Sequence, residues 1–464
     1  MLNILFLVLV GFVSPEDSGS SPLWTGFLGP PRPEVNEMSV PLEWSPTEHV
    51  AWEKEIEGYG QSSPVVWGDR VYVSSVEGTM KETLRINALD VNTGERAWAY
   101  SIPTKNQGEN TDYYSRAAPT PVVSESGICV FFENGDVVSL THDGKQLWHK
   151  DLVAEFGPIT SRHGLASSVV LTSDRVIVWV QRDQEPYLLC LKQTDGSVVW
   201  KEALPSGTTW SSPTIIDMQD GSQHLVLSVG GSGGGGPPRA QQGNSEAGSE
   251  TPAAPPKPIP GRLMGLDPAT GKRLWELEGL TGNSTPTPTR VAAGKILVGA
   301  SAGREGGPTK EAIATNGLVS ITKEGDRWSA QYLWRSERAT CGFCSPITHN
   351  GFCYFVDRRG RLYCLDAETG KEVYNENLGH PVWATPLGIG SRIYFVGEEG
   401  STTVIAAGPE YQKLASNQLW ESAEAPVDEN NPRSMLGRTR QYAVVAIPNA
   451  LFIRRGDRLY CLRP

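Results

Sequence analysis

The sequence predicts an all-β fold, an eight-bladed β-propeller of four-stranded antiparallel blades. Short runs rich in Val, Ile, Tyr and Phe flank turns that carry Gly or Asp, as in 65–76 and 351–365, which is the pattern of consecutive hairpins. One turn sequence recurs every 38 to 54 residues, apart from one wider gap. A period of about 40 to 50 residues with four short strands per unit is typical of propeller blades.

The repeated turn is clearest in RLYCLDAETGKEVY (361–374), which has near copies at 262–275 and 85–98. Its glycine recurs as Gly94, Gly144, Gly196, Gly271, Gly325, Gly370 and Gly408. In five repeats an aromatic residue follows four positions later, and in the other two, those of Gly325 and Gly408, it stands further along: Trp98, Trp148, Trp200, Trp275 and Tyr374, then Trp334 and Trp420. We expect Asp90, Asp267 and Asp366 to bond the turn backbone, the glycine to take φ > 0, and the aromatic ring to pack between blades.

A second recurring element opens each repeat, where a small residue is followed by Pro or a close variant. It stands at 62–66, 118–123, 166–170, 211–216, 284–289, 344–348 and 384–388. The two chain ends supply the eighth unit, because 443–464 reads as three strands and 49–56 as a lone strand with Trp52. Pairing these two fragments would close the ring and remove two free sheet edges.

The chain divides into three predicted parts. Residues 1–20 contain an apolar run of about ten residues, too short to span a bilayer, and we interpret them as an export signal; a buried N-terminal strand is the alternative. Residues 21–47 are an N-terminal extended segment, and 48–464 form the propeller. Within it, the Gly/Pro-rich stretch 231–260 in the fourth blade is expected to be disordered. The protein is therefore expected to be exported, periplasmic or extracellular.

The net charge of -11 argues against nucleic-acid binding, which needs a basic surface. The turn Asp90 to Gly94 followed by Trp98, with its copies at 267–275 and 366–374, resembles the repeat of the pyrroloquinoline-quinone (PQQ)-like propellers. The resemblance covers about 48–464. It implies either a quinoprotein dehydrogenase or a non-catalytic scaffold, and the chain is closest in kind to the BamB-like propeller proteins of outer-membrane assembly.

The irregular segments are predicted to share one face of the propeller. We letter the four strands of a blade A to D in chain order. Since these strands alternate in direction, the connections from B to C and from D to the next A emerge on one face, whereas the Asp-x-x-Thr-Gly turns, which join C to D, lie on the other. The insertions 231–260 and 303–316 and the long segments 103–117 and 422–440 all fall on the first face. Extended loops on a rigid scaffold are a usual place for binding.

A ring of residues near the mouth of the axial channel is the candidate binding site. Three positions before each strand-opening Pro, in a register that is approximate for the third and eighth blades, stand Gln61, Arg116, Leu165, Trp210, Asn283, Phe343, Trp383 and Arg440. Aromatic and Arg side chains suit a flat anionic ligand or an extended peptide. The alternative is that these residues only pack on neighbouring loops.

The enzyme alternative is a PQQ-dependent alcohol or sugar dehydrogenase. Such an enzyme needs a metal held by carboxylate and amide oxygens and an aspartate base. The projected ring contains no carboxylate, and the chain lacks the adjacent Cys-Cys pair and the extra length of the family's alcohol dehydrogenases. We therefore expect no catalytic residues, no metal and no cofactor, with PQQ and calcium only under this alternative.

The cysteines give one further candidate. Cys341 and Cys344 stand in a CxxC sequence near the predicted mouth, where a local disulfide is expected and a redox or ligand-contacting pair is the alternative. Cys190, Cys364 and Cys461 share one strand position and are expected to be buried. Cys353 is predicted to lie opposite Cys364 across its hairpin.

Together these features predict a non-catalytic, exported scaffold that binds a protein, an extended peptide or another extracytoplasmic ligand, in envelope or outer-membrane protein assembly. We expect a monomer with no transmembrane span.

Overall fold

The computed structural model describes residues 22–29, 39–111, 114–161, 163–206, 209–231, 260–282, 285–301, 310–420 and 441–464. The predicted export signal and most of the predicted disordered insertion lie outside these residues. In the part described, no helix has the length and apolar character needed to cross a membrane.

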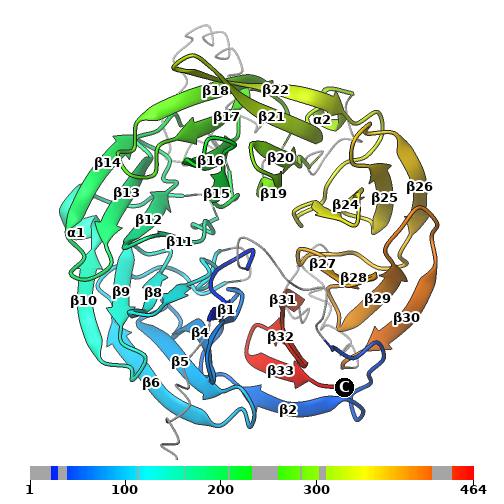
Figure 1. The fold of residues 1–464 in the computed structure, drawn as a ribbon. Helices are drawn as coiled ribbons and strands as arrows, with labels where there is room; N and C mark the ends of the chain where they lie inside the picture. Colours follow the sequence, from blue (N-terminus) through cyan, green and yellow to red (C-terminus); the bar gives the residue numbers. More distant parts are fainter. Residues whose placement is uncertain are drawn as a thin grey trace, which may run out of the picture.

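The described residues form eight antiparallel sheets arranged as a ring around a central axis (Figure 1), which confirms the predicted eight-bladed propeller. In each blade we name the strands A to D from the axis outward.

Blades 1 to 4 consist of β3 (Val65–Trp67), β4 (Arg70–Glu77), β5 (Thr83–Asp90), β6 (Arg96–Pro103); β7 (Val122–Ser124), β8 (Gly127–Phe131), β9 (Asp136–Leu140), β10 (Gln146–Asp151); β11 (Val170–Thr172), β12 (Arg175–Val180), β13 (Tyr187–Lys192), β14 (Val198–Ala203); and β15 (Thr214–Asp217), β16 (Gln223–Val229), β17 (Gly261–Leu266), β18 (Arg273–Leu280). Blades 5 to 8 consist of β19 (Thr289–Ala292), β20 (Lys295–Val298), β21 (Gly317–Glu324), β22 (Arg327–Arg335); β23 (Ile347–His349), β24 (Phe352–Val356), β25 (Arg361–Asp366), β26 (Glu372–Asn377); β27 (Leu387–Ile389), β28 (Arg392–Val396), β29 (Ser401–Ala406), β30 (Lys413–Gln418); and β31 (Gln441–Ile447), β32 (Ala450–Arg455), β33 (Arg458–Leu462), β2 (Val50–Glu55). Two short helices, α1 (Leu152–Phe156) and α2 (Lys310–Ile313), lie in connecting segments.

The ring closes as predicted, because β2 near the N-terminus is the outer strand of the C-terminal blade. Trp52 is paired with Cys461 across this antiparallel contact. In Figure 1 the blue β2 lies directly beside the red β33. Pairing the two chain ends leaves no blade incomplete, so ring closure depends on residues about 400 positions apart.

The predicted N-terminal extended segment contains a strand of its own. Strand β1 (Pro22–Trp24) pairs with the inner edge of β3, which gives blade 1 a fifth strand close to the axis (Figure 1). The next residue reaches blade 2, since the carbonyl of Thr25 accepts a hydrogen bond from the amide of Val123 at 3.0 Å. Residues 22–25 thus cover inner edges of two blades that would otherwise carry unpaired backbone groups.

A belt of hydroxyl groups explains why each repeat opens with a small residue. In successive blades the backbone N–H of the residue that precedes the Pro, or its equivalent, donates to a Ser or Thr hydroxyl at the same position of the next blade. The donor and acceptor residues, at distances of 2.9 to 3.3 Å, are Ser63 to Thr120, Thr120 to Ser168, Ser168 to Ser212, Ser212 to Thr287, Thr287 to Ser345 and Ser345 to Thr385. The belt satisfies backbone donors that no sheet partner reaches.

The belt has a different form at blade 8, where Ala443 offers no hydroxyl. Arg454, which is paired with Ala443 across β31 and β32, spans the junction with blade 1 instead. Its guanidinium donates to the hydroxyl of Ser62 at 2.8 Å and to the carbonyl of Ser74 at 2.6 Å. The side chain is fully buried. Its planar fork reaches two acceptors at once, which a hydroxyl cannot do.

Tryptophans of the outer strands hold most neighbouring blades together. The indole N–H donates to a carbonyl two or three residues before the turn glycine of the next blade, at 2.7 to 3.2 Å: Trp52 to Val91, Trp98 to His142, Trp148 to Gln193, Trp200 to Pro268 and Trp334 to Ala367. The same rings lie against the glycine itself, where a Cβ would come within 2.4 to 2.7 Å: Gly94, Gly144, Gly196, Gly271 and Gly370. These glycines have φ of 67° to 78°, so both space and backbone conformation require glycine there.

The turn carboxylates hold the backbone conformation that these glycines allow. Asp90 Oδ1 accepts hydrogen bonds from the amides of Asn92 and Thr93 at 2.8 and 3.0 Å, and Asp366 Oδ1 accepts from the amide and hydroxyl of Thr369. Asp267 binds the amide of Ala269 and the hydroxyl of Thr270 in the same way. The turn therefore presents a fixed carbonyl to the neighbouring blade.

The junction between blades 4 and 5 departs from this pattern. Trp275 donates instead to Nδ1 of His224 in its own blade, at 3.0 Å, and its ring lies on Gly265, where a Cβ would come within 2.0 Å. The turn glycine of blade 5, Gly325, has no atom within 4 Å of its Cβ position. The β21–β22 hairpin packs beside β18 instead (Figure 1).

Candidate functional site on the loop face

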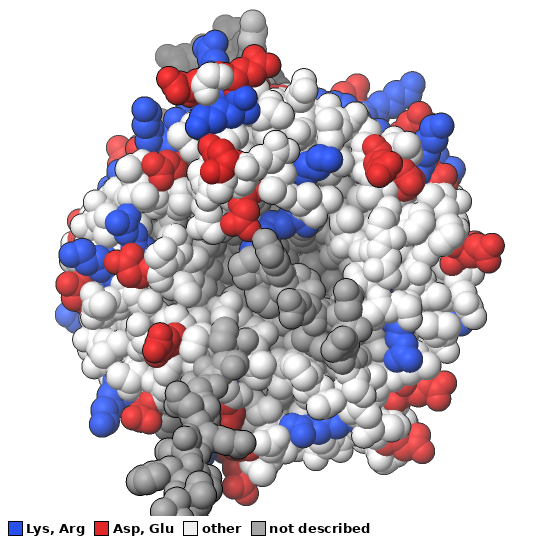
Figure 2. Space-filling model, viewed as in Figure 1, with Lys and Arg blue, Asp and Glu red and all other residues white. Residues whose placement is uncertain are grey.

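The connections fall on the faces that the strand directions predict. The B–C connections (β16 to β17, β20 to β21) and the D–A connections (β6 to β7, β30 to β31) share one face, which we call the loop face. The A–B and C–D connections share the opposite face, the turn face. On the face seen in Figures 1 and 2, side chains of Lys and Arg alternate with those of Asp and Glu toward the rim, and the described surface nearer the axis is mostly uncharged.

Gln61 and Arg116 lie together where the loops entering blades 1 and 2 meet. The amide of Arg116 donates to Oε1 of Gln61 at 2.8 Å, and the amide of Gln61 donates to the carbonyl of Arg116 at 3.0 Å. The Arg116 guanidinium stacks over the ring of Tyr59 at 3.5 Å from the centroid, and the side chain is largely buried. This pair links two loops of adjacent blades.

The hydroxyl belt corrects the alignment that placed Arg116 in the predicted ring. Gln61, Trp210, Phe343 and Trp383 each stand two residues before a belt residue, whereas Arg116 stands four before Thr120. The opening of blade 2 contains two prolines, and the alignment used the first. Leu165, the third-blade residue of the predicted ring, stands three residues before Ser168 and is therefore also out of register, by one position. It is buried. Asn283 and Arg440 lie outside the described residues.

A buried ion pair, which the sequence did not indicate, holds the loop that carries Arg116. Lys81 Nζ lies 3.1 Å from Glu133 Oε1 and also donates to the carbonyl of Ser115. The other carboxylate oxygen accepts from the amide of Ala117 at 2.9 Å. Burial raises the pKa of the Glu133 carboxyl, and the nearby Lys81 ammonium opposes this rise. These contacts hold 115–117 from both sides and so fix the loop at the channel mouth beside blades 1 and 2.

Phe343 and Trp383 form the most extensive aromatic contact of the predicted ring. They come from the loops entering blades 6 and 7, and their rings stack with centroids 4.1 Å apart and an interplanar angle of 25°. The guanidinium of Arg358, in the B–C turn of blade 6, lies 4.6 Å from the Phe343 centroid. All three residues are half-buried. The layered Arg358, Phe343 and Trp383 are called the aromatic stack below.

Trp210 lies apart from the aromatic stack, at the entry to blade 4. Its ring meets that of His163 at 5.8 Å between centroids, in a tilted arrangement, so loops of blades 3 and 4 touch there. Trp210 is half-buried. Of the predicted ring residues that the structure describes, Gln61 therefore pairs with Arg116 and Phe343 with Trp383, each across adjacent loops.

Cys341 and Cys344 are free, buried thiols in the structure, and their pairing as a disulfide stays a prediction. The Cys344 sulfur approaches the carbonyl of Val356 at 3.8 Å, much as the Ser211 hydroxyl binds the Ser228 carbonyl at the same repeat position of blade 4. Burial raises the pKa of both thiols, to about 12 for Cys344.

The predicted opposition of Cys353 and Cys364 is wrong by one residue. Cys353 is paired with Leu365, and Cys364 with Tyr354. Successive side chains of a strand point to opposite faces, so the two sulfurs lie on different sides of the sheet. Cys190, Cys364 and Cys461 share one strand position and are buried, as predicted, and each is paired with an outer-strand aromatic residue.

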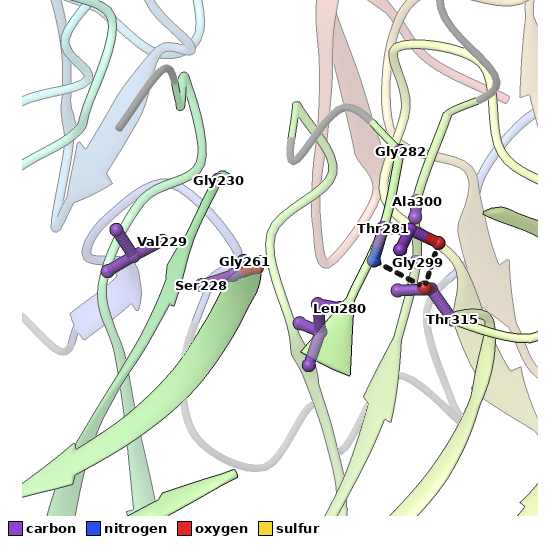
Figure 3. A pocket seen from close by; sticks show the side chains of 10 residues that line it. All are labelled: Ser228, Val229, Gly230, Gly261, Leu280, Thr281, Gly282, Gly299, Ala300 and Thr315. Atoms are coloured by element: carbon purple, nitrogen blue, oxygen red, sulfur yellow. Dashed lines mark hydrogen bonds between the residues drawn. The ribbon is translucent and has the colours of Figure 1, made fainter. Parts of the chain in front are cut away.

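A small cavity on the loop face between blades 4 and 5 is shown in Figure 3. It measures about 10 Å³, which is room for at most one water molecule. The Thr315 hydroxyl accepts a hydrogen bond from the amide of Thr281 at 2.9 Å across it. The lining residues are Ser228, Val229, Gly230, Gly261, Leu280, Thr281, Gly282, Gly299, Ala300 and Thr315. Among the described residues, no group of three or more His, Cys, Asp or Glu side chains is placed to hold a metal ion.

These features define the class of the molecule: a closed eight-bladed propeller whose repeat residues are structural and whose loop face presents paired aromatic and Arg side chains. The chain belongs to the family described as outer membrane protein assembly factor BamB, whose model matches residues 43–157, 133–220 and 261–462. This agrees with the resemblance to PQQ-like propellers found in the repeats.

Individual proteins are similar to this chain in sequence or in fold. The outer membrane protein assembly factor BamB of Moranella endobia (strain PCIT) is 26% identical over 305 residues, which cover 61% of this chain and 63% of that protein. The match thus spans less than two thirds of the relative's length. The crystal structure of BamB from Moraxella catarrhalis has a TM-score of 0.55 at 12% identity, with 89% of this chain and 97% of that chain covered. The computationally designed protein Ika8 has a TM-score of 0.53 at 12% identity, with coverages of 88% and 98%. At such identities the two structures show the fold alone.

Proposed function

We propose that this protein is an exported, non-catalytic propeller that binds a protein partner through its loop face during assembly of outer-membrane proteins. The observation that carries the proposal is the aromatic stack. Trp, aromatic and Arg side chains that are partly desolvated dominate the binding energy of protein interfaces. Here three such side chains from two adjacent blades lie in one layered contact at 4.1 and 4.6 Å. Membership of the BamB family supports the partner class.

The loop face suits binding because the backbone beneath its aromatic stack is held in place by hydrogen bonds. The hydroxyl belt runs directly beneath the loops that carry Phe343 and Trp383, through Ser345 and Thr385. Such anchoring reduces the conformational entropy that the loops lose when a partner binds. The aromatic rings are therefore preorganised for an extended peptide or a protein surface.

Affinity capture from the native envelope, followed by chemical cross-linking and mass spectrometry, tests the proposal. Phe343→Ala and Trp383→Ala should each weaken capture of an outer-membrane assembly component about 30-fold or more, the effect of losing a residue worth about 2 kcal/mol. Leu333→Ala, on an exposed side chain of β22, is the matched control and should leave capture unchanged. Equal capture by all variants would place the interface elsewhere.

The alternative, a PQQ-dependent alcohol or sugar dehydrogenase, has a separate test. Such an enzyme holds calcium through carboxylate and amide oxygens beside the quinone. We expect no alcohol-dependent dye reduction and no quinone spectrum after incubation with PQQ and calcium. Dye reduction above the protein-free rate would overturn the non-catalytic assignment.

A further inference from the structure

A groove of about 470 Å³ crosses the turn face over blade 4, on the side opposite the aromatic stack. Its walls come from the A–B turn of blade 3, the A–B and C–D turns of blade 4, and the β21–β22 hairpin of blade 5. Grooves of roughly 300 to 1,000 Å³ are the size in which proteins hold ligands. Neither the repeat nor the family membership assigns it a role.

The groove arises where the repeat pattern fails. At the regular junctions the outer-strand tryptophan crosses to the next blade, but Trp275 lies on Gly265 of its own blade. The hairpin of blade 5 is left free to pack beside β18, and it brings Trp328 edge-on to His224 at 4.4 Å between ring centroids. Trp328 thus becomes a half-exposed apolar wall of the groove, together with Leu274.

The charged side chains along the groove are held by ion pairs or hydrogen bonds within its walls. Lys323 Nζ lies 3.1 Å from Asp220 Oδ2, and Arg175 Nε lies 3.5 Å from Asp174. The carboxylate of Asp267 accepts from the amide of Ala269 and the hydroxyl of Thr270 in its own turn. A charged ligand would have to displace one of these contacts, so the groove favours an uncharged ligand.

His224 supplies a donor that the fold leaves unused. Its Nδ1 accepts from the Trp275 indole, so in the neutral imidazole the proton is carried by Nε2. Burial lowers the pKa of His224 and keeps the ring neutral. Only 1% of the residue is exposed, it lines the groove, and its Nε2 has no hydrogen-bond partner in the described part of the chain. A donor from which no group of the described chain accepts favours a ligand that brings an acceptor.

We propose that this groove binds an uncharged, extended peptide segment of the polyproline type, with a backbone carbonyl accepting from His224 Nε2 and apolar rings packed on Trp328 and Leu274. Carbonyl groups in a polyproline II helix have no internal hydrogen bonds and are free to accept. Proline-rich segments dock in aromatic-lined grooves because the ligand is already extended and loses little entropy. The ligand chemistry matches the wall chemistry on all three counts: charge, donor and apolar surface.

Isothermal titration calorimetry of the full-length protein with acetylated, amidated decaproline tests this site. Decaproline should bind with a Kd below about 1 mM, and Trp328→Ala should weaken binding 10-fold or more. Leu333→Ala, on an exposed side chain of β22 outside the groove lining, is the matched control and should bind like the wild type. Leu274→Asp is a second variant, which adds a charge to the groove wall and leaves the Trp328 ring in place. It should also weaken binding.

Three results would overturn the proposal. They are the absence of binding at millimolar decaproline, tighter binding of a capped decaglutamate or decalysine, and equal binding by wild type, Trp328→Ala and Leu274→Asp. Since Trp383 belongs to the proposed protein interface and Trp328 to the groove, failure of either site leaves the other testable.

Discussion

The junction between blades 2 and 3 and the junction between blades 4 and 5 use an equivalent tryptophan in different ways. Trp148 crosses to blade 3, where its indole donates to the carbonyl of Gln193 at 2.8 Å. Trp275 stays on its own blade and donates to His224 at 3.0 Å. The residues paired with them in strand C are Ser139 and Gly265.

The difference teaches that the direction of a docking ring follows space and an available acceptor. Gly265 removes the Cβ that would meet the Trp275 ring at 2.0 Å, and His224 provides the acceptor. Because both the space and the acceptor lie inside the blade, the Trp275 indole makes its hydrogen bond there and not with the C–D turn of blade 5. The same sequence motif therefore makes a rigid junction in one place and a groove in another.

Removing a docking tryptophan at a regular junction should have the largest effect. Trp148→Ala deletes a buried ring between two blades and should cost about 3 to 5 kcal/mol, since the cavity cannot fully collapse. Chemical denaturation measures the loss. Leu147→Ala removes the exposed neighbour and should change stability by less than about 0.5 kcal/mol. Similar losses in the two variants would contradict the docking role.

The junction between blades 8 and 1 provides a third case, in which an arginine replaces the belt hydroxyl. Arg454→Leu leaves the Ser62 hydroxyl and the Ser74 carbonyl without their donor, and should cost about 3 kcal/mol. Arg454→Lys should recover only part of this, because an ammonium cannot reach both acceptors in one plane. Thermal unfolding of both variants checks the order. Full recovery by lysine would show that charge alone matters there.

Adding one methyl group should convert the irregular junction toward the regular one. Gly265→Ala places a Cβ against the Trp275 ring and should cost about 1 to 3 kcal/mol as overpacking. The matched control is Ala88→Gly, at the equivalent position facing Trp98, which should cost only about 0.5 to 1 kcal/mol. A crystal structure of each variant shows whether the indole moves. An unmoved Trp275 with unchanged stability would contradict the account of the groove.

The two junctions also contain histidines whose stability effects should depend on pH in opposite directions. The hydrogen bond to Asp136, at 2.6 Å, raises the pKa of His149 beside Trp148, whereas burial lowers the pKa of His224. The His149 contribution should be complete below the unfolded pKa of about 6.5 and be lost as pH rises through the raised folded pKa. The His224 contribution should be complete above about 6.5 and be lost as pH falls through the lowered folded pKa.

NMR titration of the two imidazoles checks this smallest effect. His149 should titrate above and His224 below the ordinary value, and His149→Gln should remove only the loss of stability on the alkaline side. Titration of both rings at one pH would contradict the contrast between the junctions.

Much of the scaffold could be predicted because each blade repeats its own local signals. The turn glycines, the Asp caps and the alternation of strand directions are properties of a few adjacent residues, and they placed the long loops on one face. Ring closure also followed, since 49–56 and 443–464 are each incomplete alone. The small residue before each Pro was visible as a pattern, but its hydroxyl bond to the next blade was not.

The candidate site was harder to predict because it depends on pairs of loops. The two prolines at the opening of blade 2 shifted the alignment of Arg116, and the exchange of hydrogen bonds with Gln61 could not be read from either loop alone. The ion pair of Lys81 and Glu133 joins residues 52 positions apart without a recurring motif. Phe343 and Trp383 were named from their positions, but their stacking on each other was not foreseen.

From the sequence alone follow the all-β class, the eight blades, the closure of the ring and the face on which the irregular loops lie, because periodic turns and strand alternation are local and additive. Only the tertiary structure decided where β1 lies, how Arg454 bridges the last junction, which loop residues stack together, and that Trp275 turns back onto its own blade. Each of these depends on which side chain finds space and a hydrogen-bond partner across a blade boundary, and that choice is made by packing.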